Sequence, residues 1–382
     1  MIKNLIEFLK YRESRSVGLV FAVNSIFFGS WITRLPDIQD KIQIGEGDLG
    51  LALLGLPLGS VSAMPFISYF IQKYGAGRVT IIIGIVFCII SSLPVFATSH
   101  LGLFFILVMV GISTGSMDIA MNASAAIVEK EQKRAIMSSC HGFWSFGGMV
   151  GAASTSILAG MAVPSKIQMV VLAALLMLTL VYLSRILFSI EEPSTQKNKI
   201  FVIPKGILVS LALVAFCIML GESAIMDWST IYLRKSLNTE LILAGMGFAG
   251  FSMTMAIGRF YGDILITKWG PRKLVLTGLL IGITGVLMAL IINNSLIAIL
   301  GFTFAGFGFS CLVPAVYISA AKVPGISAGA GLASVASLGY FGLFVGPPTI
   351  GMIAEMYGLN IGLGIVVILL ATAFLLANQT KF

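Results

Sequence analysis

The sequence predicts an all-α integral membrane protein with twelve transmembrane helices arranged in two similar six-helix halves. Three observations lead to this fold class: the composition, the number of long apolar runs and an internal repeat. Of the 382 residues, 58% are hydrophobic and only 10% are charged, which would give a soluble chain of this length a vast exposed apolar surface. A lipid bilayer is the surrounding that fits this composition.

Long apolar runs place the membrane spans along the chain. About 20 apolar residues cross a bilayer, and we count twelve such runs. Several contain Gly and Pro, which membrane helices tolerate. The first run follows a charged segment but precedes no small-residue cleavage site, so we expect a retained helix rather than a removed signal peptide. The approximate extents are 16–36, 47–71, 79–98, 101–128, 136–162, 167–189, 205–233, 241–266, 274–293, 295–321, 328–354 and 358–378.

An internal repeat relates the two halves of the chain. The stretch from Gly50 to Arg78 returns 195 residues later without a gap. Six of the thirteen glycines between residues 50 and 151 recur in register, where about one or two would recur by chance. The pairs are Gly50 and Gly245, Gly55 and Gly250, Gly75 and Gly270, Gly111 and Gly306, Gly147 and Gly342, and Gly151 and Gly346. This period is too long for a solenoid and predicts two related bundles.

The domain boundaries follow from the repeat and from one polar segment. Residues Glu191–Lys199 form the only sizeable polar linker, and they fall at the midpoint of the chain. We therefore expect an N-terminal six-helix bundle over residues 1–190, a cytoplasmic linker over residues 191–204 and a C-terminal six-helix bundle over residues 205–382.

The distribution of Lys and Arg predicts the orientation. With twelve spans both termini share one side, and nineteen of the 24 Lys and Arg residues fall on that side. Because cytoplasmic loops are enriched in these residues, we expect both termini in the cytoplasm. Topology then accounts for the net charge of +8 without a nucleic-acid partner. The four cysteines lie within spans and lack paired spacing, so we expect them to pack as small apolar residues rather than form disulfides or bind metal.

Titratable residues inside the spans are candidates for proton coupling. Asp118 lies near the bilayer centre in span four, Glu222 near the middle of span seven, and Asp227 nearer the outside of span seven. A carboxylate there is costly unless it is paired, hydrated or protonated. His141 in span five could also shuttle protons, although a lone histidine is as often a packing residue. Because His141 lies close to cytoplasmic water, we expect Glu222 to be the second essential titrating group beside Asp118.

Polar and aromatic residues in the same spans are candidates for a substrate cavity. They are Asn24, Trp31, Asn122, Trp144 and Trp228. Because Asn122 follows Asp118 by four residues, both should face the same way on a helix. This mixture suits stacking on, and hydrogen bonding to, a sugar-like ligand. A cavity rich in Phe would equally serve an amphiphile, so export of an amphiphile is the alternative.

Charged residues near the membrane faces, with the glycines between them, are candidates for gating. They are Arg34, Lys73, Gly75, Arg78, Arg259, Asp263, Lys268, Gly270 and Arg272. Arg34 and Asp37 are three residues apart, so a helix would place them on one face. Arg259 and Asp263 are four apart and are expected to pair at the cytoplasmic edge. Arg34 and Asp227 lie in the outer parts of spans one and seven, and we expect them to meet when the outer gate closes.

Basic turns follow spans two and eight, Gln72-Lys73-Tyr74-Gly75-Ala76-Gly77-Arg78 and Thr267-Lys268-Trp269-Gly270-Pro271-Arg272-Lys273. Together with twelve spans in two like halves, these turns resemble the major facilitator superfamily. They are similar to the family's Gly-x-x-x-Asp-Arg-x-Gly-Arg-Arg/Lys turn, with Gln72 and Thr267 in place of its Asp. The resemblance implies the major facilitator fold over the whole chain.

Three segments carry a more specific resemblance: Ser30-Trp31-x-x-Arg34-x-Pro36, His141-Gly-x-Trp144-Ser145-x-Gly147-Gly148 and Gly221-Glu222-x-x-x-x-Asp227-Trp228-Ser229. Within the superfamily they make the chain resemble a poorly characterised bacterial inner-membrane branch, which is itself similar to the proton-coupled fucose permeases. The acidic-x-x-x-Asn pattern of those permeases matches Asp118 and Asn122, and their Asn-Asp-Ile loosely matches Pro36-Asp37-Ile38. The resemblance implies proton coupling at Asp118, more loosely at Asp37, and a location in the bacterial cytoplasmic (inner) membrane.

These observations predict a secondary active transporter that works by alternating access, most simply by proton-coupled uptake of a sugar-like polar molecule. A proton-antiport exporter of an amphiphilic metabolite or drug is the alternative, and Na⁺ is open as the coupling ion.

The sequence has no Gly-x-x-x-x-Gly-Lys-Ser/Thr stretch, so we do not expect an ATP-driven pump. With two His and no clustered acids or Cys, we expect neither a membrane enzyme nor a metal site. A signalling receptor would usually carry a soluble output domain. The expected partners are a small-molecule substrate and the lipid bilayer, with the chain as a monomer and the proton gradient in place of any cofactor.

Overall fold

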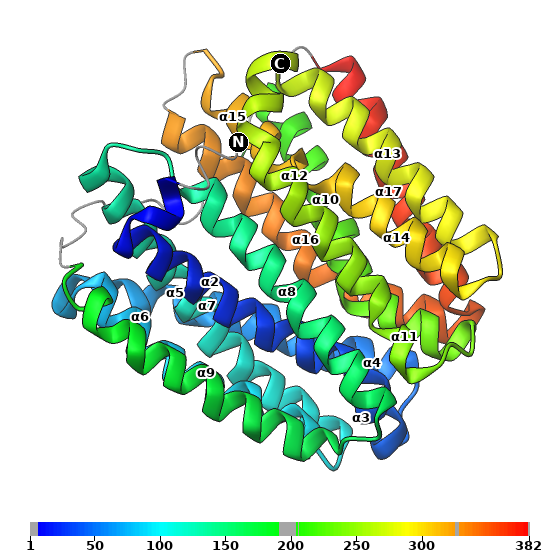
Figure 1. The fold of residues 1–382 in the computed structure, drawn as a ribbon. Helices are drawn as coiled ribbons and strands as arrows, with labels where there is room; N and C mark the ends of the chain where they lie inside the picture. Colours follow the sequence, from blue (N-terminus) through cyan, green and yellow to red (C-terminus); the bar gives the residue numbers. More distant parts are fainter. Residues whose placement is uncertain (1–6, 191–203, 205, 325–327, 381–382) are drawn as a thin grey trace.

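The computed structural model describes residues 7–190, 204, 206–324 and 328–380, without the side chains of Asp263 and of residues 328–330. The described residues form helices and no strands (Figure 1). The elements are α2 (Arg12–Thr33), α3 (Leu35–Ile42), α4 (Glu46–Leu53), α5 (Gly55–Tyr74), α6 (Ala76–Ser91), η1 (Pro94–Phe96), α7 (His100–Gln132), α8 (Met137–Gly160), α9 (Ser165–Leu187), α10 (Ile207–Ile231), η2 (Tyr232–Ser236), α11 (Leu241–Ala244), α12 (Met246–Trp269), α13 (Pro271–Ile291), α14 (Ser295–Phe309), α15 (Leu312–Ala321), α16 (Ala328–Tyr357) and α17 (Leu359–Gln379). The predicted all-α membrane fold is confirmed.

Eleven spans are long and apolar enough to cross a membrane among the described residues, and α8 completes the predicted twelve by its length. Its low hydropathy has a structural cause, because α8 packs between α2 and α12. A Cβ atom on Gly147 or Gly151 would lie 2.5 or 2.1 Å from a carbonyl oxygen of α2. A Cβ atom on Gly142 would lie 2.5 Å from the Phe260 ring of α12. Small residues permit such close approach of helices, so this central span is rich in Gly and Ser rather than in large apolar residues.

The repeat of 195 residues is a structural repeat. A Cβ atom on Gly111 would lie 2.1 Å from the carbonyl oxygen of Leu56, and one on Gly306 would lie 2.2 Å from that of Phe251. The two contacts are equivalent, because Gly306 and Phe251 each lie 195 positions after Gly111 and Leu56. The glycines that end the second span of each half share one conformation, with φ/ψ of 85°/147° at Gly75 and 77°/157° at Gly270. The fold thus consists of two pseudo-symmetric halves of six spans.

The first half comprises α2 to α9 and the second α10 to α17. The predicted linker, residues 191–204, lies outside the described residues except for Pro204, so the domain boundaries stay a prediction. We call the side on which α2 begins and α17 ends the termini side, and the opposite side the far side (Figure 1).

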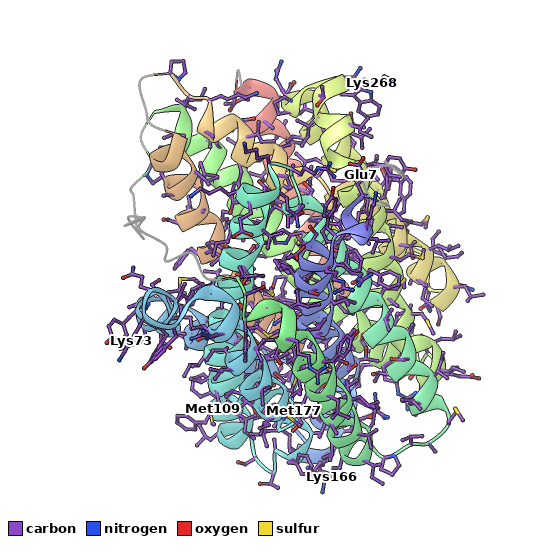
Figure 2. All side chains as sticks on the ribbon, turned by 60° about the vertical axis from the view of Figure 1, so that its left-hand side comes forward. Glu7, Lys73, Met109, Lys166, Met177 and Lys268 are labelled. Carbon is purple, nitrogen blue, oxygen red and sulfur yellow. The ribbon has the colours of Figure 1, made fainter. Side chains whose placement is uncertain are left out.

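The two halves meet most closely at the far side. There α16 packs on α4, whereas it barely touches α5, which continues the same span towards the termini side. A Cβ atom on Gly50 of α4 would lie 2.5 Å from the carbonyl oxygen of Pro347 on α16. In Figure 2, Lys73 at the end of α5 lies far from Lys268 at the end of α12. The seam between α4–α5 and α16 is therefore closed at the far side and diverges towards the termini side.

Candidate substrate and proton-coupling site

An arginine links the two halves near the middle of the spans. Arg259 of α12 donates from Nη1 to Ser145 Oγ on α8 at 2.8 Å and from Nη2 to Glu222 Oε1 on α10 at 3.2 Å. Its guanidinium carbon lies 5.9 Å from the centroid of the Trp144 ring. The side chains of Arg259 and Glu222 are 16% and 15% exposed, so neither is completely sealed from solvent. This ion pair places a charge of each sign at the contact between the halves.

The sequence predicts Arg259 at the cytoplasmic edge, paired with Asp263. The side chain of Asp263 lies outside the described residues, so that pair is not tested. The partner that the structure does show, Glu222, is 37 positions away in the chain and could not be found from local spacing. Ser145 lies in one of the segments that carry the family resemblance.

An amide and an indole lie beside this pair. Trp144 Nε1 donates to Asn24 Oδ1 at 3.0 Å, and Asn24 Nδ2 donates to the Met117 sulfur at 3.5 Å. Asn24 is 3% exposed. Because a thioether is a weak acceptor, the amide hydrogens of Asn24 are poorly satisfied in a buried position. The sequence-predicted residues Asn24 and Trp144 are thus brought together, and both lie against groups that could bind a polar ligand.

An aromatic wall extends from Trp144 towards the far side. Phe28 of α2 lies 6.2 Å from Trp144, 5.7 Å from Trp31 and 6.2 Å from Phe248 of α12, measured between ring centroids. Trp31 and Trp228 are 1% and 0% exposed, so in this conformation both are packed in the interior. Their contact with a substrate stays a prediction.

Asp118 and Asn122 face the same way, as their spacing predicts. Asn122 Nδ2 donates to Asp118 Oδ1 at 3.1 Å and to the Asp118 carbonyl oxygen at 2.8 Å. From the second half, Tyr340 of α16 lies within electrostatic range of Asp118. Within the described part of the chain, Asp118 has no ion-pair partner. Its partners are therefore neutral.

The other proton-coupling candidates lie in different surroundings. Asp227 is 6% exposed and accepts a hydrogen bond of 3.0 Å from Ser223, one turn earlier on α10. His141 makes an edge-to-face contact with Phe21, with 5.3 Å between ring centroids. Asp37 is bonded to Arg34. Among the described residues, none of these three shares a hydrogen bond or an ion pair with Asp118 or Glu222.

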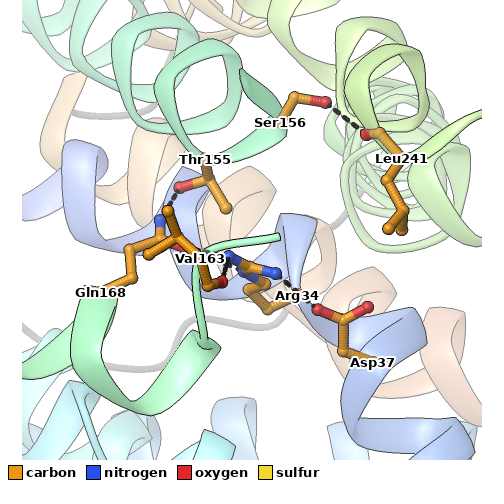
Figure 3. A network of polar contacts seen from close by, with 7 residues as sticks. All are labelled: Arg34, Asp37, Thr155, Ser156, Val163, Gln168 and Leu241. Carbon is orange, nitrogen blue, oxygen red and sulfur yellow. Dashed lines mark hydrogen bonds and ion pairs between the residues drawn. The ribbon is translucent and has the colours of Figure 1, made fainter. Parts of the chain in front are cut away.

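Arg34 belongs to a polar network within the first half (Figure 3). Its Nε and Nη2 atoms donate to Gln168 Oε1 at 2.9 and 2.6 Å, and Nη2 also donates to the Val163 carbonyl oxygen at 2.8 Å. Nη1 donates to Asp37 Oδ2 at 2.8 Å, which confirms the predicted local pair. Gln168 in turn donates to Thr155 at 2.6 Å. This network fixes α2, α3 and α9 to one another.

The predicted pair of Arg34 and Asp227 is wrong in this conformation, although the far side is closed. The guanidinium donates to the first turn of α9 and to the connection before it, and Asp227 accepts from Ser223. The position of Arg34 along its span was predicted correctly, but spacing could not show that Val163 and Gln168 supply acceptors within the same half.

The two basic turns are each held within their own half. Lys73 lies 5.8 and 5.1 Å from the ring centroids of Tyr69 and Tyr74 on its own helix. Arg272 Nη2 donates to the Asn378 carbonyl oxygen at the end of α17, at 2.5 Å. Gly75 and Gly270 take the positive φ angles that a turn of this kind requires. Lys268 is exposed in the last turn of α12, and Arg78 lies in the first turn of α6, which begins at Ala76. A gating role for these residues stays a prediction.

Residues that the sequence did not single out for gating close the far side. Lys235 forms an ion pair with Asp40 across the halves. The backbone N–H of Gly47 donates to Glu355 Oε2 at 2.6 Å. Ser156 of α8 donates to the Leu241 carbonyl oxygen at 3.1 Å (Figure 3). The glycines at 45, 47 and 50 were a sequence signal for this close approach, because a Cβ atom on any of them would lie within 2.7 Å of α16.

Comparisons with known proteins agree with this architecture. The family model described as the Major Facilitator Superfamily matches residues 17–208 and 211–379. An uncharacterised MFS-type transporter of Yersinia pestis is 33% identical over 94% of this chain and 93% of its own length. An uncharacterised transporter of Sinorhizobium fredii is 31% identical over 96% of this chain and 98% of its own length.

Solved structures share the fold at lower identity. A bacterial homologue of the human lysosomal transporter Spinster, in an inward-facing and occupied conformation, has a TM-score of 0.73 and 17% identity, covering 96% of each chain. The nucleoside transporter NupG has a TM-score of 0.66 and 14% identity, covering 96% of this chain and 97% of its own. The family match spans almost the whole sequence, and the fold has twelve spans in two halves. The chain belongs to the major facilitator superfamily.

Proposed function

We propose that the protein is a secondary active transporter of the bacterial inner membrane that takes up a small polar solute together with protons. The family and the transporter relatives support the transport class. The polar and aromatic groups of both halves, described above, support a polar solute with hydrogen-bonding groups. Alternating access then requires the two halves to rock around this central site.

The conformation is the inward-facing one in this proposal. The Lys and Arg distribution favours a cytoplasmic termini side, and the halves are closed by Glu355, Lys235 and Ser156 on the far side. A solute would then reach Arg259 and Glu222 from the cytoplasm. The outward-facing state would break these far-side contacts and bring α5 against α16.

The observation that carries proton coupling is the environment of Asp118. It lies in the middle of α7, its hydrogen-bond partner is the neutral Asn122, and no ion pair neutralises it among the described residues. An ionised carboxylate is costly inside a membrane protein once water is excluded. A proton on Asp118 removes that cost, so the occluded carrier favours the protonated form and the hydrated, open carrier allows release. Asp118 is thus the primary proton carrier in the proposal, while Glu222 is balanced by Arg259.

A ligand-stabilisation screen of the purified protein tests the substrate class. Sugars, glycosides, nucleosides and amphiphilic drugs are compared for their effect on the thermal unfolding midpoint. A stabilising solute is then followed in proteoliposomes in which the external pH is lower than the internal pH. Accumulation that collapses with the proton gradient supports the proposal. Accumulation that follows a Na⁺ gradient instead contradicts proton coupling, and proton-driven extrusion supports the exporter.

A further inference from the structure

The guanidinium of Arg259 is shared between the halves rather than locked into one pair. Its contact with Glu222 is one hydrogen bond of 3.2 Å, and its contact with Ser145 is one of 2.8 Å. Arginine and carboxylate groups pair most strongly through two parallel hydrogen bonds. A pair joined by one longer bond leaves donor capacity on Arg259 for another carboxylate.

The groups around Arg259 are rich in donors. Trp144 lies against the guanidinium, and the same indole donates to Asn24. The Asn24 amide nitrogen has the sulfur of Met117 as its acceptor. A buried amide with so weak an acceptor gains from a ligand oxygen that replaces the thioether. Together these groups favour a ligand that brings acceptors to the site.

The charges that face Glu222 decide what its protonation would do. Arg259 faces it from α12, and Tyr317 of α15 lies within electrostatic range. His141 of α8 lies within electrostatic range of Arg259, and Asp227 is farther along α10. Arg259 is thus the cation that is paired with Glu222. A proton added to Glu222 alone would leave the largely buried guanidinium without a counter-charge.

We propose that Arg259 binds a carboxylate group of the substrate, and that this carboxylate and a proton on Glu222 enter the site together. The inference rests on the proposed transport function and names its substrate class, a polar organic acid. In the exchange the proton joins a Glu222 oxygen, the Glu222–Arg259 hydrogen bond opens, and the substrate carboxylate accepts the N–H groups that are released. The site holds one positive and one negative charge before and after, so the loaded carrier can close without a net buried charge.

A neutral solute would gain nothing from this exchange. It would leave Glu222 paired with Arg259, and the coupling proton would then be carried by Asp118 alone. The two cases therefore differ in whether binding at Arg259 depends on pH through Glu222.

Acetate and its neutral isostere acetamide test the inference on the purified full-length protein. Thermal unfolding midpoints are measured with each compound at equal concentration between pH 5.5 and 8. A chloride salt keeps the ionic strength constant. We expect acetate to stabilise the protein with an apparent affinity that rises as pH falls, by up to about tenfold per pH unit for one coupled proton. Acetamide should have no such effect. Equal stabilisation by acetamide, or no stabilisation by acetate at any pH, overturns the inference.

Variants identify the groups involved. Glu222→Gln mimics the protonated carboxyl, so acetate should bind it as tightly at pH 8 as it binds wild type at low pH. Arg259→Gln should lose the acetate effect, and Arg259→Lys should weaken it because the planar fork is gone. Arg185→Gln, an arginine on the exposed face of α9 outside the site, is the control and should bind acetate as wild type does. An unchanged pH dependence in Glu222→Gln overturns the inference even if Arg259→Gln fails to fold.

The inference and the transport proposal fail in different ways. If acetate does not stabilise the protein while a neutral solute is accumulated in response to the proton gradient, the carboxylate inference is wrong and the transport proposal is supported. If acetate binds as expected but no solute is moved by a proton gradient, the carboxylate site is supported and the proposed proton coupling is wrong.

Discussion

Glu355 at the end of α16 caps a helix of the opposite half, because its Oε2 atom accepts a hydrogen bond of 2.6 Å from the backbone N–H of Gly47 in the first turn of α4. The first turn of a helix carries unsatisfied N–H groups and a partial positive charge. Gly45 and Gly47 leave room for the carboxylate, since a Cβ atom on either would lie within 2.7 Å of it. This contact holds the far side closed, because it joins α4, near the start of the chain, to α16, near its end.

Removal of this cap should shift the carrier towards opening at the far side. Hydrogen bonds to charged groups contribute about 1.5–3 kcal/mol, so Glu355→Ala should change the ratio of closed to open molecules about tenfold or more. Gly47→Ala should act in the same direction because its Cβ atom displaces the carboxylate. Distances between spin labels at Ser99 and Asn238, on far-side loops of the two halves, report the shift. Glu240→Ala, an exposed carboxylate on the same side, is the control, and distances unchanged from wild type in both test variants would refute the capping role.

Arg34 should be needed for stability rather than for gating. It is 4% exposed and donates to Gln168, Val163 and Asp37. Arg34→Ala leaves these acceptors without their donor and should cost about 2–4 kcal/mol of folding stability. A lowered thermal unfolding midpoint in detergent, with near-normal transport per folded molecule, is expected. Arg185→Ala on the exposed face of α9 should be neutral. An Arg34→Ala protein of normal stability that fails to transport would instead favour a gating role.

The structural repeat predicts equal penalties at equivalent glycines. Gly111→Ala and Gly306→Ala each place a methyl group about 2 Å from a backbone carbonyl oxygen of the second span in the same half. Overpacking of this kind costs about 1–3 kcal/mol, so both variants should lower the unfolding midpoint by similar amounts. Gly364→Ala, where nothing lies within 4 Å of the new atom, should leave it unchanged. A large effect at one glycine and none at its equivalent would contradict the equivalence of the two contacts.

The parts of the structure that sequence reasoning reached are those fixed by short spacing or by repetition. Asp118 and Asn122 are four residues apart, so helix geometry alone brings them together. Most glycines of the repeat mark close helix contacts in both halves, and their register in the sequence predicted the pseudo-symmetry. The pairing of Glu222 with Arg259 was out of reach for a physical reason. Apolar runs give the depth of a residue in the membrane, but the rotation of each helix about its axis depends on packing against the others.

The same limit applies to two predicted pairs: Arg34 with Asp227, which is wrong in this conformation, and Arg259 with Asp263, which is not tested. Arg34 and Asp227 were placed near the outer surface, yet their partners come from the connection before α9 and from the preceding turn of α10. Arg259 was assigned to the membrane edge, but its long side chain extends to acceptors on α8 and α10 instead. Charged side chains near the middle of a bundle bind whichever acceptor packing brings within reach, and one sequence alone does not show which one that is.

The most direct test of proton-coupled transport is substrate-driven proton movement through the Asp118→Asn variant. Proteoliposomes with a pH-sensitive dye inside are given the solute identified by the stabilisation screen. Wild type should acidify the interior as the solute enters and should accumulate it against its gradient. For a neutral solute, Asp118→Asn should show neither effect while it still exchanges labelled for unlabelled solute, because binding and rocking do not need the titrating group. For an organic acid it should lose only the proton that Asp118 carries and should keep the proton that enters on Glu222. Proton-driven accumulation by Asp118→Asn at the wild-type level would contradict the account.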